Sequence, residues 1–300
     1  MATQMERLAS MHIGKQLSRL SLENSVKPQF NGDKLSYHVN DRDIELTLDG
    51  TTINAIVNGD FMFSNSINRK NIVAQKAAFL INALRHGSLN VKNSLILSDI
   101  DGTLVKGSLV LDHAVYLHDK NILNLGELPK AWVNDKKNDS IITELAEAYR
   151  ESIVGQSEDD LLVQTYIDDV VSNDDKFYSS LHKINNLKAN GSDVIVVSGS
   201  PNYLVNKLAE KFGFKAASSE YQKDNMGRFN GEINVPMFSG SHKKNYVNSL
   251  NLTNYDHIIA YGDTCSDKPL FDVANYNVLV NPGVSHLNEL KDVIDDVIQD

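Results

Sequence analysis

The 300-residue chain lacks the features that mark several large protein classes. It contains one cysteine, Cys265, so no disulfide can form within the chain, and its thiol content does not point to an oxidising compartment. No apolar run approaches the roughly 18 residues of a membrane-spanning helix. The N-terminal residues also lack the apolar core and cleavage site of a secretory signal. We therefore expect a cytoplasmic protein without a membrane partner.

Positive charge is scarce as well. The sequence has 29 lysine and arginine residues against 39 aspartates and glutamates, a net charge of −10. Nucleic acids and anionic membranes favour basic surfaces, so this balance argues against either as a general partner. The nine histidines show no metal-ligand spacing, and no internal repeat is visible. What the chain does have is an apolar share of 41%, enough for the core of a globular protein.

Residues 1 to about 90 predict a small α+β extension. The first 20 residues place apolar side chains at helical spacing, although an organelle presequence or a bacterial effector leader has a similar pattern. Short alternating segments separated by turn residues predict an antiparallel meander, and a second helix is predicted over 67–85. The predicted strands are 35–39, 44–48 and 52–57. No catalytic constellation is visible here, so an interaction protein or effector that binds a partner through this block is one alternative function.

Residues 107–185 predict a helical insert. The expected helices lie near 109–118, 140–151, 157–171 and 174–187. Ser157 and the acids that follow it are typical of a helix start. The insert contains 15 acidic and 7 basic residues, so a net charge of −8 is concentrated in this part of the chain. We expect that charge to disfavour polyanionic substrates.

The remaining residues alternate between strand and helix patterns. Strands are predicted at 95–98, 193–197, 215–217, 257–261 and 278–280, and helices at 203–212 and 243–250. Such alternation predicts an α/β fold with a doubly wound parallel sheet. The expected domains are the extension (1–90), a core (91–106 and 186–300) and the helical insert (107–185).

Polar residues follow three of the predicted strands. Asp99-Ile100-Asp101-Gly102-Thr103 comes after the first, Ser198-Gly199-Ser200 after the second, and Gly262 to Asp267 after a third. Taken alone, the first segment is also compatible with a capped turn. Because the carboxyl ends of neighbouring parallel strands meet at one edge of a sheet, however, we expect the three segments to form one site.

With these motifs, the chain resembles the haloacid dehalogenase superfamily of phosphohydrolases. The ordered motifs of that superfamily match Asp99 to Thr103, Ser198, Lys243 or Lys244, and Asp263 with Asp267. Residues 227–233 and 281–283, together with the helical insert, are similar to the phosphoserine-phosphatase-like branch, subfamily IB. The resemblance extends over residues 93 to 283.

The resemblance implies a Mg²⁺-dependent hydrolysis of phosphate monoesters. Asp99 would be the nucleophile that forms an aspartyl phosphate, and Asp101 would protonate the leaving group and then activate water. The implied metal ligands are Asp99, the backbone carbonyl of Asp101, and Asp263, with Asp267 supporting them. Carboxylates are suitable oxygen ligands for Mg²⁺, which offsets the charge of a phosphate dianion.

The remaining roles concern the phosphoryl group and the substrate. By resemblance, Thr103, the Ser198 hydroxyl and the Gly199 amide bind phosphoryl oxygens, while a lysine offsets the charge of the transition state. Helical spacing favours Lys243 over Lys244 for that lysine, because Val247 lies one turn further along the same helix face.

The insert is similar to a cap that closes over the site and selects the substrate. Arg150 is a candidate ligand for a carboxylate or phosphate of the substrate, and a surface ion pair with Glu147 or Glu151 is the alternative. Ser108 stands where known phosphoserine phosphatases usually carry a glutamate that recognises an amine. This difference argues against phosphoserine itself. The negative charge of the insert favours a small, singly phosphorylated metabolite, with or without an amine, as substrate, and transfer of the phosphoryl group to an alcohol is the enzymatic alternative.

Overall fold

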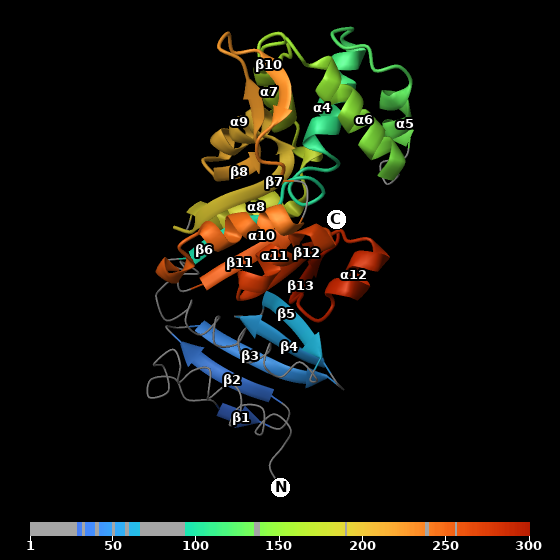
Figure 1. The fold of residues 1–300 in the computed structure, drawn as a ribbon. Helices are drawn as coiled ribbons and strands as arrows, with labels where there is room; N and C mark the ends of the chain where they lie inside the picture. The colour runs from blue at the N-terminus through green and yellow to red at the C-terminus, as the bar shows by residue number, and fades with distance from the viewer. Residues whose placement is uncertain are drawn as a thin grey trace. The chain divides into compact units, whose positions relative to one another are not determined.

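The computed structural model describes residues 29–31, 34–39, 42–49, 52–57, 60–66, 94–134, 139–189, 191–237, 240–255 and 257–300. The helices predicted in the first 20 residues and over 67–85 lie outside these residues. The chain divides into two compact units (Figure 1), one containing residues 1–94 and 189–192 and the other containing 95–188 and 193–300. Among the described helices, none has both the length and the apolar character that crossing a bilayer requires.

The described part of the first unit is a five-stranded antiparallel sheet. Its order is β1-β2-β3-β4-β5, the order of the chain. Leu35 pairs with Leu46 and Tyr37 with Ile44, and these four side chains are almost fully buried. Since successive side chains of a strand point to opposite faces, one face of this sheet is covered. The strands are β1 (Gln29–Asn31), β2 (Lys34–Val39), β3 (Arg42–Asp49), β4 (Thr52–Val57) and β5 (Asp60–Ser66), of which β2 to β4 correspond to the predicted meander.

A parallel six-stranded sheet forms the centre of the second unit. Its order is β13-β12-β11-β6-β7-β8, so the chain starts in the middle of the sheet and builds outward in both directions. Every residue of β6 and β11 is buried, as expected for parallel strands covered on both faces. The bounds are β6 (Ser94–Ser98), β7 (Asp193–Pro201), β8 (Lys215–Ser219), β11 (His257–Gly262), β12 (Tyr276–Val280) and β13 (Asp296–Ile298). This topology confirms the predicted doubly wound α/β fold.

Helices pack on both faces of this sheet. In β7, Ile195 and Val197 join the apolar cluster of Val247 and Leu270, whereas Val196 between them lies beside Leu208 on the other face. The covering helices are α8 (Ser179–Ala189), α9 (Asn202–Phe212), α10 (Gly240–Ser249), α11 (Lys268–Val273) and α12 (Val284–Leu290), with the 3₁₀ turns η4 (Leu252–Asn254) and η5 (Cys265–Asp267).

The insert between β6 and β7 is helical, as predicted, but it also contains a helix over 128–134 that was not predicted, and two of the predicted helices differ. The helix predicted over 157–171 begins at Val163 rather than at Ser157, because Leu162 has a φ of +47° that interrupts a right-handed helix. Ser157 instead closes a short turn with Asp160. The insert contains α4 (Leu109–Asp119), α5 (Leu128–Asn134), α6 (Asp139–Ser152), α7 (Val163–Ser172) and η3 (Asp174–Lys176). The segment predicted as one helix over 174–187 is divided into η3 and α8.

A small hairpin follows β8. Its strands are β9 (Tyr221–Lys223) and β10 (Phe229–Ile233), and they pair antiparallel. The hairpin contacts the insert, since the backbone N–H of Gly155 donates to the Phe229 carbonyl and the N–H of Phe229 donates to the Gln156 carbonyl. The parallel sheet, the insert and this hairpin therefore surround the same region of the second unit.

Candidate active site

The three polar segments lie together at the carboxyl edge of the parallel sheet. Asp99 directly follows β6, Ser198 is in β7, and Asp263 directly follows β11. The backbone N–H of Asp99 donates to the carbonyl of Tyr261 at 3.0 Å, so the ends of β6 and β11 are joined. Convergence of strand ends, which the sequence predicted, thus positions acidic and hydroxyl side chains in one place.

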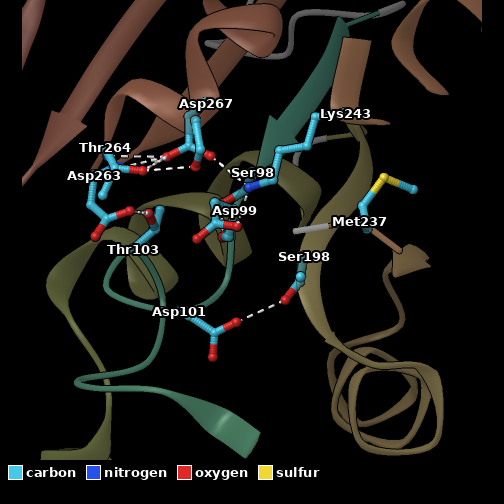
Figure 2. Close-up of polar contacts among 12 residues, drawn as sticks. Ser98, Asp99, Asp101, Thr103, Ser198, Met237, Lys243, Asp263, Thr264 and Asp267 are labelled. Carbon is cyan, nitrogen blue, oxygen red and sulfur yellow. Dashed lines mark hydrogen bonds and ion pairs between the residues drawn. The ribbon is translucent and has the colours of Figure 1, made fainter. Parts of the chain in front are cut away.

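Lys243 lies between two of the aspartates. Its Nζ donates to Oδ1 of Asp99 and to Oδ1 of Asp267, both at 2.6 Å, and Figure 2 shows this arrangement. The Lys243 side chain is buried, as is Val247 one turn later in α10, whereas Lys244 is exposed. The face of α10 that packs on the sheet therefore carries Lys243 into the site and leaves Lys244 in solvent.

The aspartates are crowded in a buried environment. Burial, together with repulsion by Asp267 and Asp101, raises the pKa of Asp99 to about 8 although Lys243 opposes the shift. Burial and the charges of Asp99 and Asp267 raise the pKa of Asp263 to about 9. Burial alone would lower the pKa of Lys243, but Asp267 and Asp99 raise it above its usual range. The site therefore holds more negative charge than one ammonium group can offset.

Three of these carboxylates suit a divalent cation. One oxygen each from Asp99, Asp263 and Asp267 lie within 4.8 Å of one another. Carboxylate oxygens are the ligands that Mg²⁺ uses in proteins, and buried acids without enough counter-charge favour a bound cation. The donor set therefore fits the predicted metal, although the backbone carbonyl of Asp101 is not part of this group of side chains.

The loop after β11 is held by Asp267. Its Oδ2 accepts hydrogen bonds from the backbone N–H groups of Asp263 at 3.0 Å and Thr264 at 3.1 Å, while its Oδ1 accepts from Lys243. Asp267 is fully buried. Each oxygen is thus engaged, which orients the backbone that carries the Asp263 carboxylate.

Gly102 allows Asp263 to approach the first motif. Its φ is +78°, and a Cβ at this position would overlap Oδ2 of Asp263 and lie 2.8 Å from its Cγ. Only glycine combines this backbone conformation with such a close approach. The glycine of the motif is therefore required by the packing of its own site.

Asp101 is oriented by three hydrogen-bond donors. Its carboxylate accepts from the backbone N–H of Leu109 at 2.5 Å, from Ser198 Oγ at 2.8 Å and from Ser200 Oγ at 2.8 Å. Burial raises the pKa of Asp101, although these donors oppose the shift. Ser200 was not among the site residues predicted from the sequence. Its position two residues after Ser198, on the same side of β7, is the signal that could have identified it.

Thr103 and Ser198 are fully buried in this structure. The Thr103 hydroxyl donates weakly to Oδ1 of Asp263 at 3.5 Å, and the Ser198 hydroxyl donates to Asp101. Both hydroxyls therefore contact the acidic residues. Their contacts with phosphoryl oxygens stay predictions, as do the roles assigned to the other site residues.

A cavity of about 550 Å³ opens over the aspartates. From the core it is lined by Asp99, Asp101, Lys243, Asp263 and Gly199, among others, and from the insert by residues of α4 and α6 that include Arg150. Among the residues that the structure describes, no carboxylate forms an ion pair with Arg150. The alternative of a surface ion pair with Glu147 or Glu151 is not observed, and the guanidinium is available to the cavity.

Comparison with known proteins places this geometry in context. Residues 96–272 match the family model described as haloacid dehalogenase-like hydrolase, which spans all the motifs of the site. No curated protein matches the chain significantly.

Solved structures share the fold at low sequence identity. A protein of unknown function from Bordetella pertussis Tohama I is 16% identical, with a TM-score of 0.53, over 69% of this chain and 98% of that one. A probable phosphoserine phosphatase from Vibrio cholerae, in unliganded form, is 13% identical, with a TM-score of 0.50, over 82% of this chain and 73% of that one. At such identities the likeness concerns the fold alone.

Proposed function

Because the chain belongs to the family of haloacid dehalogenase-like hydrolases, we propose that it is a Mg²⁺-dependent phosphatase that hydrolyses a small phosphate monoester in the cytoplasm. The observation that supports this most directly is the position of Asp99. Its carboxylate contacts Lys243, lies within 4.8 Å of the ligand oxygens of Asp263 and Asp267, and lines a cavity large enough for a metabolite. The similar fold of a probable phosphoserine phosphatase is compatible with this substrate class.

Asp99 acts as the nucleophile in this proposal. One carboxylate oxygen attacks phosphorus in line, the O–P bond forms, and the P–O bond to the leaving alcohol breaks. Water then attacks the aspartyl phosphate, the bond between Asp99 and phosphorus breaks, and inorganic phosphate leaves. The Lys243 ammonium, held by both Asp99 and Asp267, offsets negative charge as the phosphoryl group is transferred.

Asp101 moves the protons. It gives a proton to the leaving oxygen in the first step and takes one from water in the second. A pKa raised by burial favours the protonated carboxyl that the first step needs. The donors Ser198, Ser200 and the backbone N–H of Leu109 fix the orientation of this carboxyl.

The metal would be held by Asp99, the backbone carbonyl of Asp101, and Asp263, with Asp267 supporting the loop. When bound, Mg²⁺ supplies positive charge that lets a phosphate dianion approach these carboxylates. Thr103, Ser198 and the amide of Gly199 are the proposed ligands of phosphoryl oxygens. Arg150 is the proposed contact to a phosphate or carboxylate group of the substrate, because it lines the cavity from the insert.

A panel of phosphate monoesters with Mg²⁺ tests the proposal. The wild type is expected to release phosphate, and Asp99→Asn is expected to lose nearly all of this activity. Asp272→Asn is a matched control, since Asp272 is half-exposed and pairs with Lys268 on the surface of α11. Equal turnover by wild type and Asp99→Asn would contradict the proposed nucleophile. Analysis of the products with an added alcohol distinguishes hydrolysis from phosphotransfer.

A further inference from the structure

Part of the wall of the cavity over the aspartates is apolar. Six of its lining residues are hydrophobic, and they come from α4, α6, the β9–β10 hairpin and the segment after it. They are Val110, Leu111, Ala146, Tyr221, Ile233 and Met237. Because several separate elements contribute them, apolar surface faces the cavity from more than one side.

This wall is a packed part of the molecule. Leu111, Tyr221 and Met237 are at least nine-tenths buried, and the ring of Tyr221 packs edge-on against the ring of Tyr203 with centroids 5.8 Å apart. Met237 belongs to the apolar cluster around Val247 that covers the sheet. The wall is therefore preformed, and a bound group does not have to create it.

The polar lining residues have other places. Those of the core surround the aspartates, and those of the insert are Ser108, Thr143 and the oppositely charged Glu147 and Arg150. Glu147 is exposed, so its carboxylate remains in contact with solvent. Ser108, at the start of α4, adds no charge. The hairpin and the segment after it thus offer a mainly apolar surface to a leaving group, whereas the insert offers side chains of both kinds.

Leaving groups of different polarity interact differently with such a wall. Against the apolar residues, the hydroxyl or ammonium groups of a short polar leaving group would lose water without gaining a hydrogen-bond partner, which is unfavourable. Hydrocarbon, in contrast, gains from each group removed from water. At about 550 Å³ the cavity is in the range of sites that enclose organic ligands much larger than phosphate.

We propose that this site takes phosphate monoesters with an apolar leaving group, of the alkyl or arylalkyl class, in preference to short polar ones. The proposal rests on the proposed phosphatase function and names its substrate class. The phosphoryl group lies over Asp99, and the hydrocarbon part contacts Leu111, Tyr221, Ile233 and Met237.

A series of ethyl, butyl and hexyl phosphate tests the proposal with the full-length protein. These alcohols have similar leaving-group basicity, so differences in kcat/KM report binding of the hydrocarbon. We expect kcat/KM to rise about three- to fourfold for each methylene that is buried. Benzyl phosphate should be hydrolysed better than glycerol phosphate or ethanolamine phosphate. Equal kcat/KM for the three alkyl phosphates, or a higher kcat/KM for glycerol phosphate and ethanolamine phosphate, would overturn the proposal while leaving the phosphatase function intact.

A pair of variants locates the effect. Ile233→Thr introduces a hydroxyl into the wall and should reduce the advantage of hexyl over ethyl phosphate. Val235→Thr is the matched control, since Val235 follows the same strand but is exposed and does not line the cavity. It should leave the series unchanged. If kcat/KM rises equally along the alkyl series in wild type and in Ile233→Thr, the assignment of the wall is wrong. If the wild type hydrolyses no ester faster than Asp99→Asn does, both proposals are overturned.

Discussion

The hydroxyl groups of Tyr149 and Tyr203 lie 2.7 Å apart between the insert and the core. Tyr149 is in α6 and Tyr203 is in α9, and both side chains are buried. The Tyr149 hydroxyl also lies 2.9 Å from Nδ1 of His113 in α4, and Nε2 of His113 lies 2.9 Å from the carbonyl of Leu161. Three helices and the segment before α7 are therefore linked by one buried chain of hydrogen bonds.

The carbonyl at one end of this chain determines its direction. A carbonyl can only accept, so the Nε2–H of neutral His113 donates to Leu161, and Nδ1 accepts from the Tyr149 hydroxyl. Tyr203 then donates to the oxygen of Tyr149. The tautomer of His113 follows from these partners, and each polar atom of the chain is satisfied.

We predict that Tyr149→Phe destabilises the protein more than Tyr203→Phe. The first substitution removes two hydrogen bonds and leaves Nδ1 of buried His113 without a donor, which costs about 1–3 kcal/mol. The second removes one bond and leaves the donor to His113 in place, for a loss of about 1 kcal/mol. Urea unfolding measures both, and equal losses would contradict the central position of Tyr149 in the chain of hydrogen bonds. Because Tyr149 precedes Arg150, Tyr149→Phe should also raise KM.

We predict a pH-dependent contribution of His113 to stability. Burial lowers the pKa of His113 from 6.5 to about 4 in the folded protein. Between these two pH values the folded state therefore binds fewer protons than the unfolded state. The contribution of His113 to the free energy of unfolding is complete above the pKa of the unfolded state and is lost as the pH falls towards the pKa of the folded state. From pH 7 to pH 5 the wild type should lose about 2 kcal/mol more than His113→Gln.

Urea unfolding at the two pH values checks this difference. An NMR titration of the imidazole in the folded wild type is a second measurement that does not depend on the stability of the variant. A histidine that titrates near pH 6.5 in the folded state would contradict the prediction.

Gly102→Ala should strongly reduce activity, by about a hundredfold or more, because a Cβ there displaces the Asp263 carboxylate. Gly126→Ala is the matched control. Gly126 also has a positive φ, +60°, but an added Cβ would meet nothing within 4 Å. Both variants should lose about 1–2 kcal/mol from backbone strain, and only Gly102→Ala should lose activity. Equal kcat/KM for the two variants would show that the contact with Asp263 is not needed.

The proposed role of Asp101 predicts a dependence on the leaving group. Asp101→Asn should lower kcat/KM for an alkyl phosphate by about 10² to 10⁴ because the alkoxide then leaves without a proton. The loss should be much smaller with 4-nitrophenyl phosphate, whose phenolate is a good leaving group. Ser200→Ala, which removes one donor to Asp101, should show the same trend at smaller amplitude. Equal losses for both substrates would contradict general acid catalysis by Asp101.

Local patterns in the sequence were sufficient for five of the six strands of the parallel sheet, all except β13, and for the grouping of the polar segments. Apolar runs such as 95–98 and 257–261 indicate buried parallel strands, and the geometry of such a sheet brings the residues after them together. Helical spacing in α10 also favoured Lys243, since burial of Val247 turns the same face inward. These features depend on neighbours within a few residues or on rules that hold for every parallel sheet.

Tertiary contacts decided the rest. Leu162 interrupts a helix that the pattern of Ser157 predicted to be continuous, and nothing in the local sequence shows its left-handed backbone. The donors around Asp101 come from residues 8 to 99 positions away, and the apolar wall of the cavity combines α4, α6 and the β9–β10 hairpin. The sequence by itself therefore determined most of the parallel sheet and which residues meet at its edge. Only the folded structure decided which partners each of them has, because these contacts depend on packing between elements that are distant in the chain.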